Sequence, residues 1–125
     1  MKLNCLIIED SAVQRMIVAR LVNNHPQLNL VGDFSNAIEA RNCMAIHSVD
    51  LIFLDIEMPV MNGFQLLEKL GEINFSLVFV TAYDQFAVKA FRFSALDYLL
   101  KPIDGKDLQA AVQKAMQRNW PVQQQ

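Results

Sequence analysis

The sequence has few residues that could cross-link the chain and no apolar run that could span a membrane. Only two of its 125 residues are cysteines. Cys5 and Cys43 lie far apart, and Glu9 and Asp10 interrupt the apolar start too early for an export signal. We therefore expect both thiols to be reduced and buried. The apolar runs fall well short of the roughly 18 residues that a membrane-spanning helix needs. These absences favour a cytoplasmic location.

The chain also has no large excess of either acidic or basic residues. Charged residues make up 19% of the chain, and the formal net charge is −2. A general nucleic-acid binder usually carries a basic excess, so this balance argues against one. The hydrophobic fraction of 53% excludes a disordered chain. A chain of this length is expected to form one domain whose core needs neither metal nor disulfide.

Short apolar segments alternate with helical patterns along the chain. The apolar segments predict strands at 3–8, 28–33, 51–54, 77–80 and 97–100. The segments between and after them predict helices at 12–24, 36–47, 64–70, 85–93 and 107–118. Such alternation favours parallel strands with right-handed crossovers, and five units are too few for an eight-stranded barrel. We expect an α/β, doubly wound, flavodoxin-like three-layer sandwich with strand order 2-1-3-4-5.

Apolar residues recur with helical spacing in three of these helices. In the first helix they are Val13, Met16, Ile17, Ala19, Leu21 and Val22. In the second helix the residues available for an inner face are Ala37, Ala40, Cys43, Met44 and Ile46. In the last helix the stripe is Leu108, Ala111, Val112, Ala115 and Met116. The helical pattern ends before residue 120, so we assign 1–119 to the domain and 120–125 to a tail or the start of a linker.

Polar residues follow four of the five predicted strands. Glu9 and Asp10 follow the first strand, Asp55 the third, Thr81 the fourth and Lys101 the fifth. Parallel strands end at one edge of the sheet, and ligands bind there in open α/β folds. Each residue alone has an ordinary explanation as a loop, cap or surface residue. Their joint occurrence at four strand ends is much harder to explain that way.

The first and third strands are neighbours in the expected order, so their acids should share one crevice. Glu9, Asp10 and Asp55 would repel one another unless a cation compensated them. Oxygen ligands without a nearby cysteine or histidine suit Mg²⁺. A carboxylate can also act as a nucleophile and form an acyl phosphate, which Lys101 would help to neutralise. These residues therefore predict a magnesium-dependent phosphoryl site.

The same residues match the motifs of a known family. The motif residues are Ile7-Ile8-Glu9-Asp10, Leu54-Asp55-Ile56-Glu57-Met58-Pro59, Asn62-Gly63, Val80-Thr81-Ala82 and Lys101-Pro102. Between about 2 and 118 the sequence resembles the CheY-like receiver domain of two-component response regulators. The resemblance implies that Asp55 accepts a phosphoryl group from a sensor histidine kinase and that Glu9 and Asp10 bind Mg²⁺. It further implies a metal contact from the backbone carbonyl of Glu57, and phosphoryl contacts from Thr81 and Lys101.

A finer resemblance covers the segments 81–91 and 95–102, which are similar to those of LytTR regulators. Such regulators carry a C-terminal DNA-binding domain, so the resemblance implies control of transcription through a domain outside this chain. The broader resemblance to receiver domains implies a switch in which Thr81 moves toward the phosphoryl group and Tyr98 responds. The moving surface would be the fourth helix, fifth strand and fifth helix.

The aromatic residues around the fourth helix allow two interpretations. At helical spacing most of Phe86, Phe91 and Phe93 belong in a core, yet an exposed apolar cluster would mark an interface. Homodimerisation through this surface is therefore a hypothesis for output. Tyr83, two residues after Thr81, is a candidate shield of an acyl phosphate against water. An ordinary half-buried strand tyrosine is the alternative for Tyr98.

Several other functions remain to be weighed against a phosphoacceptor module, which would not itself be an enzyme. A stand-alone receiver would act by protein–protein contact. An aspartyl-phosphate phosphatase wants a second aspartate where this chain has Glu57. A flavodoxin would need a phosphate-binding loop where Glu9 and Asp10 lie, and a degenerate receiver would not keep the full set of site residues. His25 and His47 have no partner ligands and are expected at the surface.

Overall fold

The computed structural model describes residues 2–119, so the predicted tail at 120–125 lies outside the described residues. One parallel sheet of five strands has the order β2-β1-β3-β4-β5, which confirms the predicted fold class. Each strand is close to its predicted position: β1 (Leu3–Ile8), β2 (Leu28–Phe34), β3 (Leu51–Leu54), β4 (Ser76–Thr81) and β5 (Asp97–Leu100).

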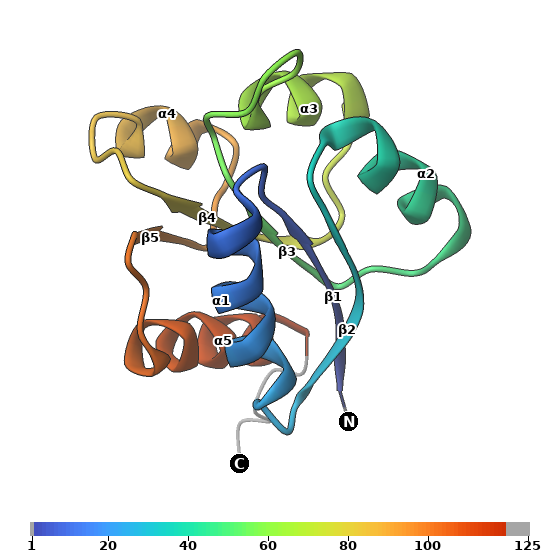
Figure 1. Ribbon diagram of the computed structural model, residues 1–125. Coiled ribbons are helices and arrows are strands. Elements are labelled where there is room, and N and C mark those ends of the chain that lie inside the picture. The colour runs from blue at the N-terminus through green and yellow to red at the C-terminus, as the bar shows by residue number, and fades with distance from the viewer. Residues whose placement is uncertain (1, 120–125) are drawn as a thin grey trace.

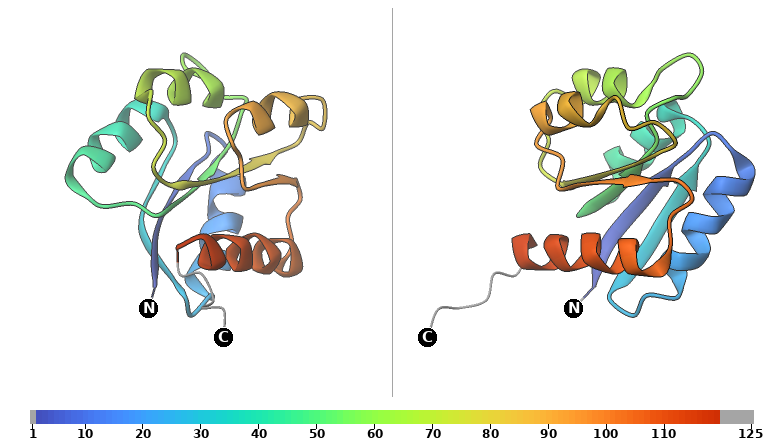
Figure 2. Two further views of the ribbon diagram at one scale, coloured as in Figure 1. Left: turned by 180° about the vertical axis from the view of Figure 1, so that it is seen from behind. Right: turned by 90° about the vertical axis from the view of Figure 1, so that its left-hand side faces the viewer.

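Five helices cover the sheet on both faces, as Figures 1 and 2 show. They are α1 (Ala12–Asn23), α2 (Ala37–Ile46), α3 (Gly63–Leu70), α4 (Ala87–Arg92) and α5 (Gly105–Asn119). Helices α1 and α5 lie on one face and α2, α3 and α4 on the other. Ser11, Asn36 and Asn62 each accept a hydrogen bond from a backbone N–H of the first turn that follows, which explains where α1, α2 and α3 begin.

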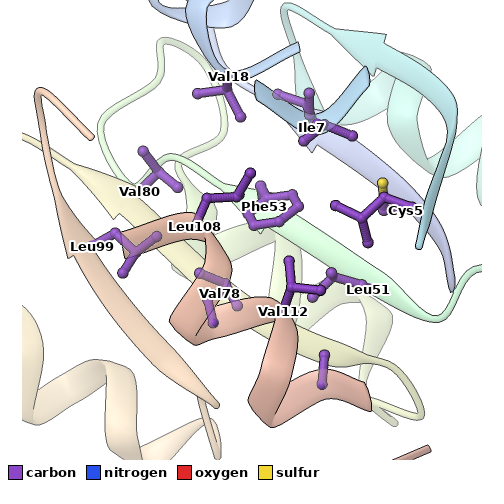
Figure 3. Packing of buried hydrophobic residues seen from close by; sticks show 14 of the residues in the cluster. Cys5, Ile7, Val18, Leu51, Phe53, Val78, Val80, Leu99, Leu108 and Val112 are labelled. Atoms are coloured by element: carbon purple, nitrogen blue, oxygen red, sulfur yellow. The ribbon is translucent and has the colours of Figure 1, made fainter. Parts of the chain in front are cut away.

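The central strands are apolar throughout because both faces of the sheet are covered. Along β3, Leu51 and Phe53 pack on the α1/α5 face, whereas Ile52 and Leu54 pack on the opposite face. Figure 3 shows Phe53 in the middle of the α1/α5 core. Burying one such side chain stabilises the fold by about 1.5–3 kcal/mol. The high hydrophobic fraction of the chain thus follows from a sheet with two cores.

The apolar stripe of the first helix differs from the sequence pattern. Val13, Met16 and Ile17 are exposed, Val13 to 61%, whereas Val18 and Val22 face the core. Helix α1 contacts the sheet along a narrow line because it lies between β1, β2 and α5. The helical spacing therefore located the helix but not its buried face: Val22 is buried, and Ala19 and Leu21 pack against the core.

Helix α2 corrects a second prediction, and α5 confirms a third. Ile46 is 80% exposed at the end of α2, because the buried contacts of that helix come from the small residues Ala37 and Ala40. Four predicted stripe residues of α5 are buried, and Met116 packs against them. None of the helices within residues 2–119 has the length and apolar character of a membrane span.

The cysteines and histidines are close to expectation. Both cysteines are free; Cys5 is buried, while Cys43 is only half-buried. Burial raises the pKa of the Cys5 thiol to about 12, which keeps it protonated and unreactive. His47 is exposed and His25 is partly buried, and Nε2 of His25 lies 2.7 Å from Oε1 of Gln109 on α5.

Candidate functional site at the carboxyl edge of the sheet

The acidic residues are held by hydrogen bonds that continue the sheet beyond its strands. The backbone N–H of Glu9 donates to the carbonyl of Phe34 at 2.9 Å, and that of Asp55 donates to the carbonyl of Ile8 at 2.9 Å. Glu9 is therefore only 2% exposed and Asp55 only 4%, whereas Asp10 is exposed. The sheet carries two carboxylates into a buried position at its carboxyl edge.

The three acids form one cluster, as the sequence predicted. Glu9, Asp10 and Asp55 each offer a carboxylate oxygen, and these oxygens lie within 4.8 Å of one another. Burial, followed by the neighbouring Glu9 carboxylate, raises the pKa of Asp55 to about 8. The buried Oε1 of Glu9 accepts no hydrogen bond within the described residues. Three carboxylates whose oxygens lie this close together fit a metal cation that would compensate their charge.

Lys101 supplies the positive charge of the cluster. Its Nζ lies 2.5 Å from Oε1 of Glu9, as an ion pair without hydrogen-bond alignment, and 3.5 Å from Oδ2 of Asp55. The backbone N–H of Lys101 donates to the carbonyl of Thr81, which fixes the lysine at the end of β5. The lysine thus contacts two of the acids and partly offsets their repulsion, in agreement with its predicted place.

Thr81 is the last residue of β4 rather than the first residue after it, and it is fully buried. Its Oγ1 accepts a hydrogen bond from the backbone N–H of Tyr83 at 3.2 Å. The carbonyl of Tyr83 in turn accepts a hydrogen bond from the hydroxyl of Tyr98 on β5. The backbone of Tyr83 therefore joins the two predicted switch residues, a role that no side-chain pattern in the sequence could indicate.

Gly63, at the start of α3, packs closely against the backbone of the loop that follows Asp55. A Cβ atom at Gly63 would lie 2.5 Å from the backbone carbonyl oxygen of Asp55. The N–H of Gly63 also donates to the carbonyl of Ile56 at 2.9 Å. The sequence marked Gly63 as part of a motif without showing this contact. Glu57 in the same loop has an exposed side chain, and the metal contact of its backbone carbonyl stays a prediction.

The aromatic residues near α4 divide between core and surface. Phe86 and Phe93 pack with Phe64 in the core on the α2/α3/α4 face, and the Phe93 ring lies 5.4 Å from that of Phe64. Phe91 is 63% exposed. The ring of Tyr83 packs edge-on against Phe86, so it lies against the start of α4, and its predicted shielding role stays a prediction.

Comparison with known proteins agrees with this geometry. Residues 5–113 match the response regulator receiver domain. An uncharacterized response regulatory protein of Vibrio cholerae is 41% identical over 118 residues, covering 94% of this chain and 50% of the relative. The sensory transduction protein LytT of Enterococcus faecalis is 39% identical over 115 residues, covering 90% of this chain and 48% of LytT. The chain thus spans about half the length of these curated relatives.

Solved structures show the same fold. The response regulatory domain of protein mrkE from Klebsiella pneumoniae is 31% identical with a TM-score of 0.83, covering 92% of this chain and 96% of that domain. The receiver (REC) domain of AraT, a response regulator from Geobacillus stearothermophilus, is also 31% identical, with a TM-score of 0.84 and coverage of 95% and 96%. With strand order, acidic cluster and sequence in agreement, the chain belongs to the response regulator receiver domain family.

Proposed function

We propose that this receiver accepts a phosphoryl group on Asp55 from a sensor histidine kinase, in a Mg²⁺-dependent reaction. The observation that carries the proposal is the burial of Asp55 within one cluster with Glu9 and Asp10, with Lys101 Nζ 3.5 Å from its carboxylate. A carboxylate so placed can attack phosphorus while the surrounding charges stabilise the transferred group. The family resemblance supports the same assignment.

The donor set fits Mg²⁺. Glu9, Asp10 and Asp55 would hold it with their carboxylates, and the backbone carbonyl of Glu57 would add a further oxygen. Bound there, Mg²⁺ would offset the negative charge of the acids and of the incoming phosphoryl oxygens.

The transfer itself is an in-line displacement. An oxygen of Asp55 forms the new bond to phosphorus, and the bond from phosphorus to the kinase imidazole nitrogen breaks. The bonding electron pair stays on that nitrogen. Lys101 stabilises a phosphoryl oxygen with its ammonium group, and the Thr81 hydroxyl donates to another. These residues bind and orient the group once, without repeated turnover, so the proposed role is that of a phosphoacceptor and not of an enzyme.

The hydrogen bonds of Thr81 provide a route to the surface. When its hydroxyl turns toward the phosphoryl group, it gives up the N–H of Tyr83, whose carbonyl holds the Tyr98 hydroxyl. The α4, β5 and α5 surface then changes its preferred arrangement, because one charge change biases a two-state element. Val88 and Phe91 of α4 are exposed on this surface and are our candidates for a homodimer contact.

The output is proposed from resemblance. LytT is named a sensory transduction protein, and this chain covers about half of it. We propose a LytTR DNA-binding domain outside this chain as the effector that controls transcription. A receiver that acts alone by protein–protein contact is the alternative. A cytoplasmic location follows from the proposed partner reaction, because the kinase draws its phosphoryl group from ATP.

Intact mass spectrometry tests the central proposal. The protein is incubated with Mg²⁺ and acetyl phosphate, and we expect the mass of one phosphoryl group to be added. Asp55→Asn should abolish the gain, while Asp107→Asn, at an exposed aspartate on α5, should not. Omitting Mg²⁺ should also abolish it. A gain that persists in Asp55→Asn would overturn the assignment, and steady release of phosphate from many phosphomonoesters would favour a phosphatase.

A further inference from the structure

A cavity of about 260 Å³ lies between the turn that follows α3, the end of α4 and the last turn of α5. Helix α5 ends on the side away from the turn between β1 and α1, as Figure 2 shows in its right-hand view, so this cavity is remote from Asp55. Arg92 and Arg118 line it together with Ile73, Phe75 and Phe93, and polar atoms make up most of its accessible lining. The described lining residues include no acid.

One of the two arginines is held in place by the start of β4. The Nη1 group of Arg118 donates to the carbonyl of Phe75 at 3.2 Å and lies 3.4 Å from Oγ of Ser76. Within residues 2–119 neither Arg92 nor Arg118 forms an ion pair, in contrast to Arg15 with Asp33. The cavity therefore presents two guanidinium groups whose charge no carboxylate of the described chain offsets.

Helix ends explain part of this arrangement. A basic residue in a last turn interacts favourably with the helix dipole, which accounts for Arg92 on α4 and Arg118 on α5. The dipole does not account for the hollow between them. The volume lies below the roughly 300–1,000 Å³ of sites for drug-sized molecules, so it suits one side chain or a short organic acid.

We propose that this cavity, the Arg92–Arg118 pocket, binds a carboxylate carried on a short apolar stem. The guanidinium groups would bind the carboxylate, since their planar donors match its two oxygens, and the apolar side chains of Ile73 and Phe93 would contact the stem. The carboxylate belongs either to a free small acid or to an acidic side chain of a protein segment. Once bound, it links the end of α4 to the end of α5. This binding site does not depend on phosphorylation of Asp55.

Nuclear magnetic resonance titration tests the pocket. The ¹⁵N-labelled protein is titrated with glutarate, against neutral glutaramide, and with the capped dipeptide acetyl-Leu-Glu-amide, against acetyl-Leu-Gln-amide. We expect saturable shifts of the backbone amides of Ile73, Arg92 and Ser94 with at least one acid and with neither neutral match. Arg92→Gln and Arg118→Gln should each weaken binding about tenfold or more, because each removes a charged hydrogen-bond donor.

Matched variants separate binding from folding. Arg20→Gln changes an exposed arginine of α1 and should leave binding unchanged. Arg92 has no ion pair to lose within the described residues, so Arg92→Gln keeps the test valid if Arg118→Gln disturbs the fold. Binding of glutarate alone would identify a free acid, and binding of the dipeptide alone would identify a protein segment. Failure of both acids to saturate, or an equal loss in Arg20→Gln, would overturn the proposal.

Discussion

The core beneath α5 and the site at the carboxyl edge of the same sheet are built on opposite principles. In the core, Phe53, Val78 and Val112 pack as apolar side chains, and every group gains from its neighbours. At the edge, the carboxyl groups of Glu9 and Asp55 are just as buried, and burial, followed by the neighbouring Glu9 carboxylate, raises the pKa of Asp55. Buried like charges destabilise a fold unless something compensates them. The core therefore supplies stability, whereas at the edge the ionisation of buried carboxyl groups opposes folding, first because burial removes them from water and second because they repel one another.

The largest expected effect lies in the core. Phe53→Ala should lower the free energy of unfolding by about 3–5 kcal/mol, because it removes a large buried ring and leaves a cavity. Urea denaturation followed by circular dichroism measures this change. Phe91→Ala removes an exposed ring and should change stability by less than about 0.5 kcal/mol. Equal losses for the two variants would contradict the packing described here.

Gly63 should show that the geometry of the site depends on close backbone packing as well as on charge. Gly63→Ala places a Cβ atom against the carbonyl of Asp55 and should destabilise the protein by about 1–3 kcal/mol. It should also slow phosphorylation, because the loop would have to move. Gly105→Ala is the matched control, since nothing lies within 4 Å of its Cβ position. Thermal unfolding and a phosphorylation time course check both expectations.

Removing the carboxyl group of Asp55 should raise the free energy of unfolding, whereas disrupting the core lowers it. The folded state raises the pKa of Asp55 from 3.8 to about 8, so its ionisation opposes folding increasingly as pH rises from 4 to 8. In EDTA at pH 8, Asp55→Asn should therefore be more stable than the unmodified chain by at least about 1 kcal/mol. The gain should be much smaller near pH 4, because Asp55 is protonated in the folded state there and only about half ionised in the unfolded state. Urea titrations at the two pH values measure the difference.

Bound Mg²⁺ is a second way to offset the cost of ionising the carboxyl groups at the edge of the sheet. Added Mg²⁺ should raise the midpoint of thermal unfolding of the unmodified chain, because it binds the folded acidic cluster. The rise should be much smaller in Asp55→Asn. A rise of the same size in both proteins would place the cation elsewhere.

The smallest expected effect concerns the link between edge and surface. Tyr98→Phe removes the hydroxyl that bonds the carbonyl of Tyr83 and should cost about 0.5–1.5 kcal/mol. Phosphorylation of Asp55 should still occur, since the hydroxyl is not among the site's acids. The change should instead appear in the amide resonances of α4 after phosphorylation. Identical resonance shifts in both proteins would remove Tyr98 from the switch.

The sheet and the site residues could be predicted because their signals are local or topological. Uniformly apolar strands indicate a sheet covered on both faces, and parallel strands bring Glu9, Asp55 and Lys101 to one edge whatever the details of packing. The burial of α1 could not be predicted, because Val13 and Val18 are equally apolar and only the position of the helix between β1, β2 and α5 decides which one is covered. Ile46 was misplaced for the same reason.

The sequence also could not predict which backbone groups contact one another in the loops. The close approach of Gly63 to the Asp55 carbonyl depends on the path of the loop, which residue types do not specify. Exposed loop residues such as Val60, at a φ of 70°, adopt backbone conformations that their side chains disfavour. Such positions are determined by the surrounding structure and not by local preference.

Tyr83 contacts both Thr81 and Tyr98 through its backbone, so these contacts do not depend on its side chain. Both the group that contacts Thr81 and the group that contacts Tyr98 belong to the peptide backbone, which every residue except proline supplies in full. Position 83 can therefore exchange its aromatic ring for other side chains while the connection between the hydroxyl groups of Thr81 and Tyr98 is kept. Under the proposed mechanism, such an exchange would change how long the phosphorylated state lasts without removing the contact that reports it.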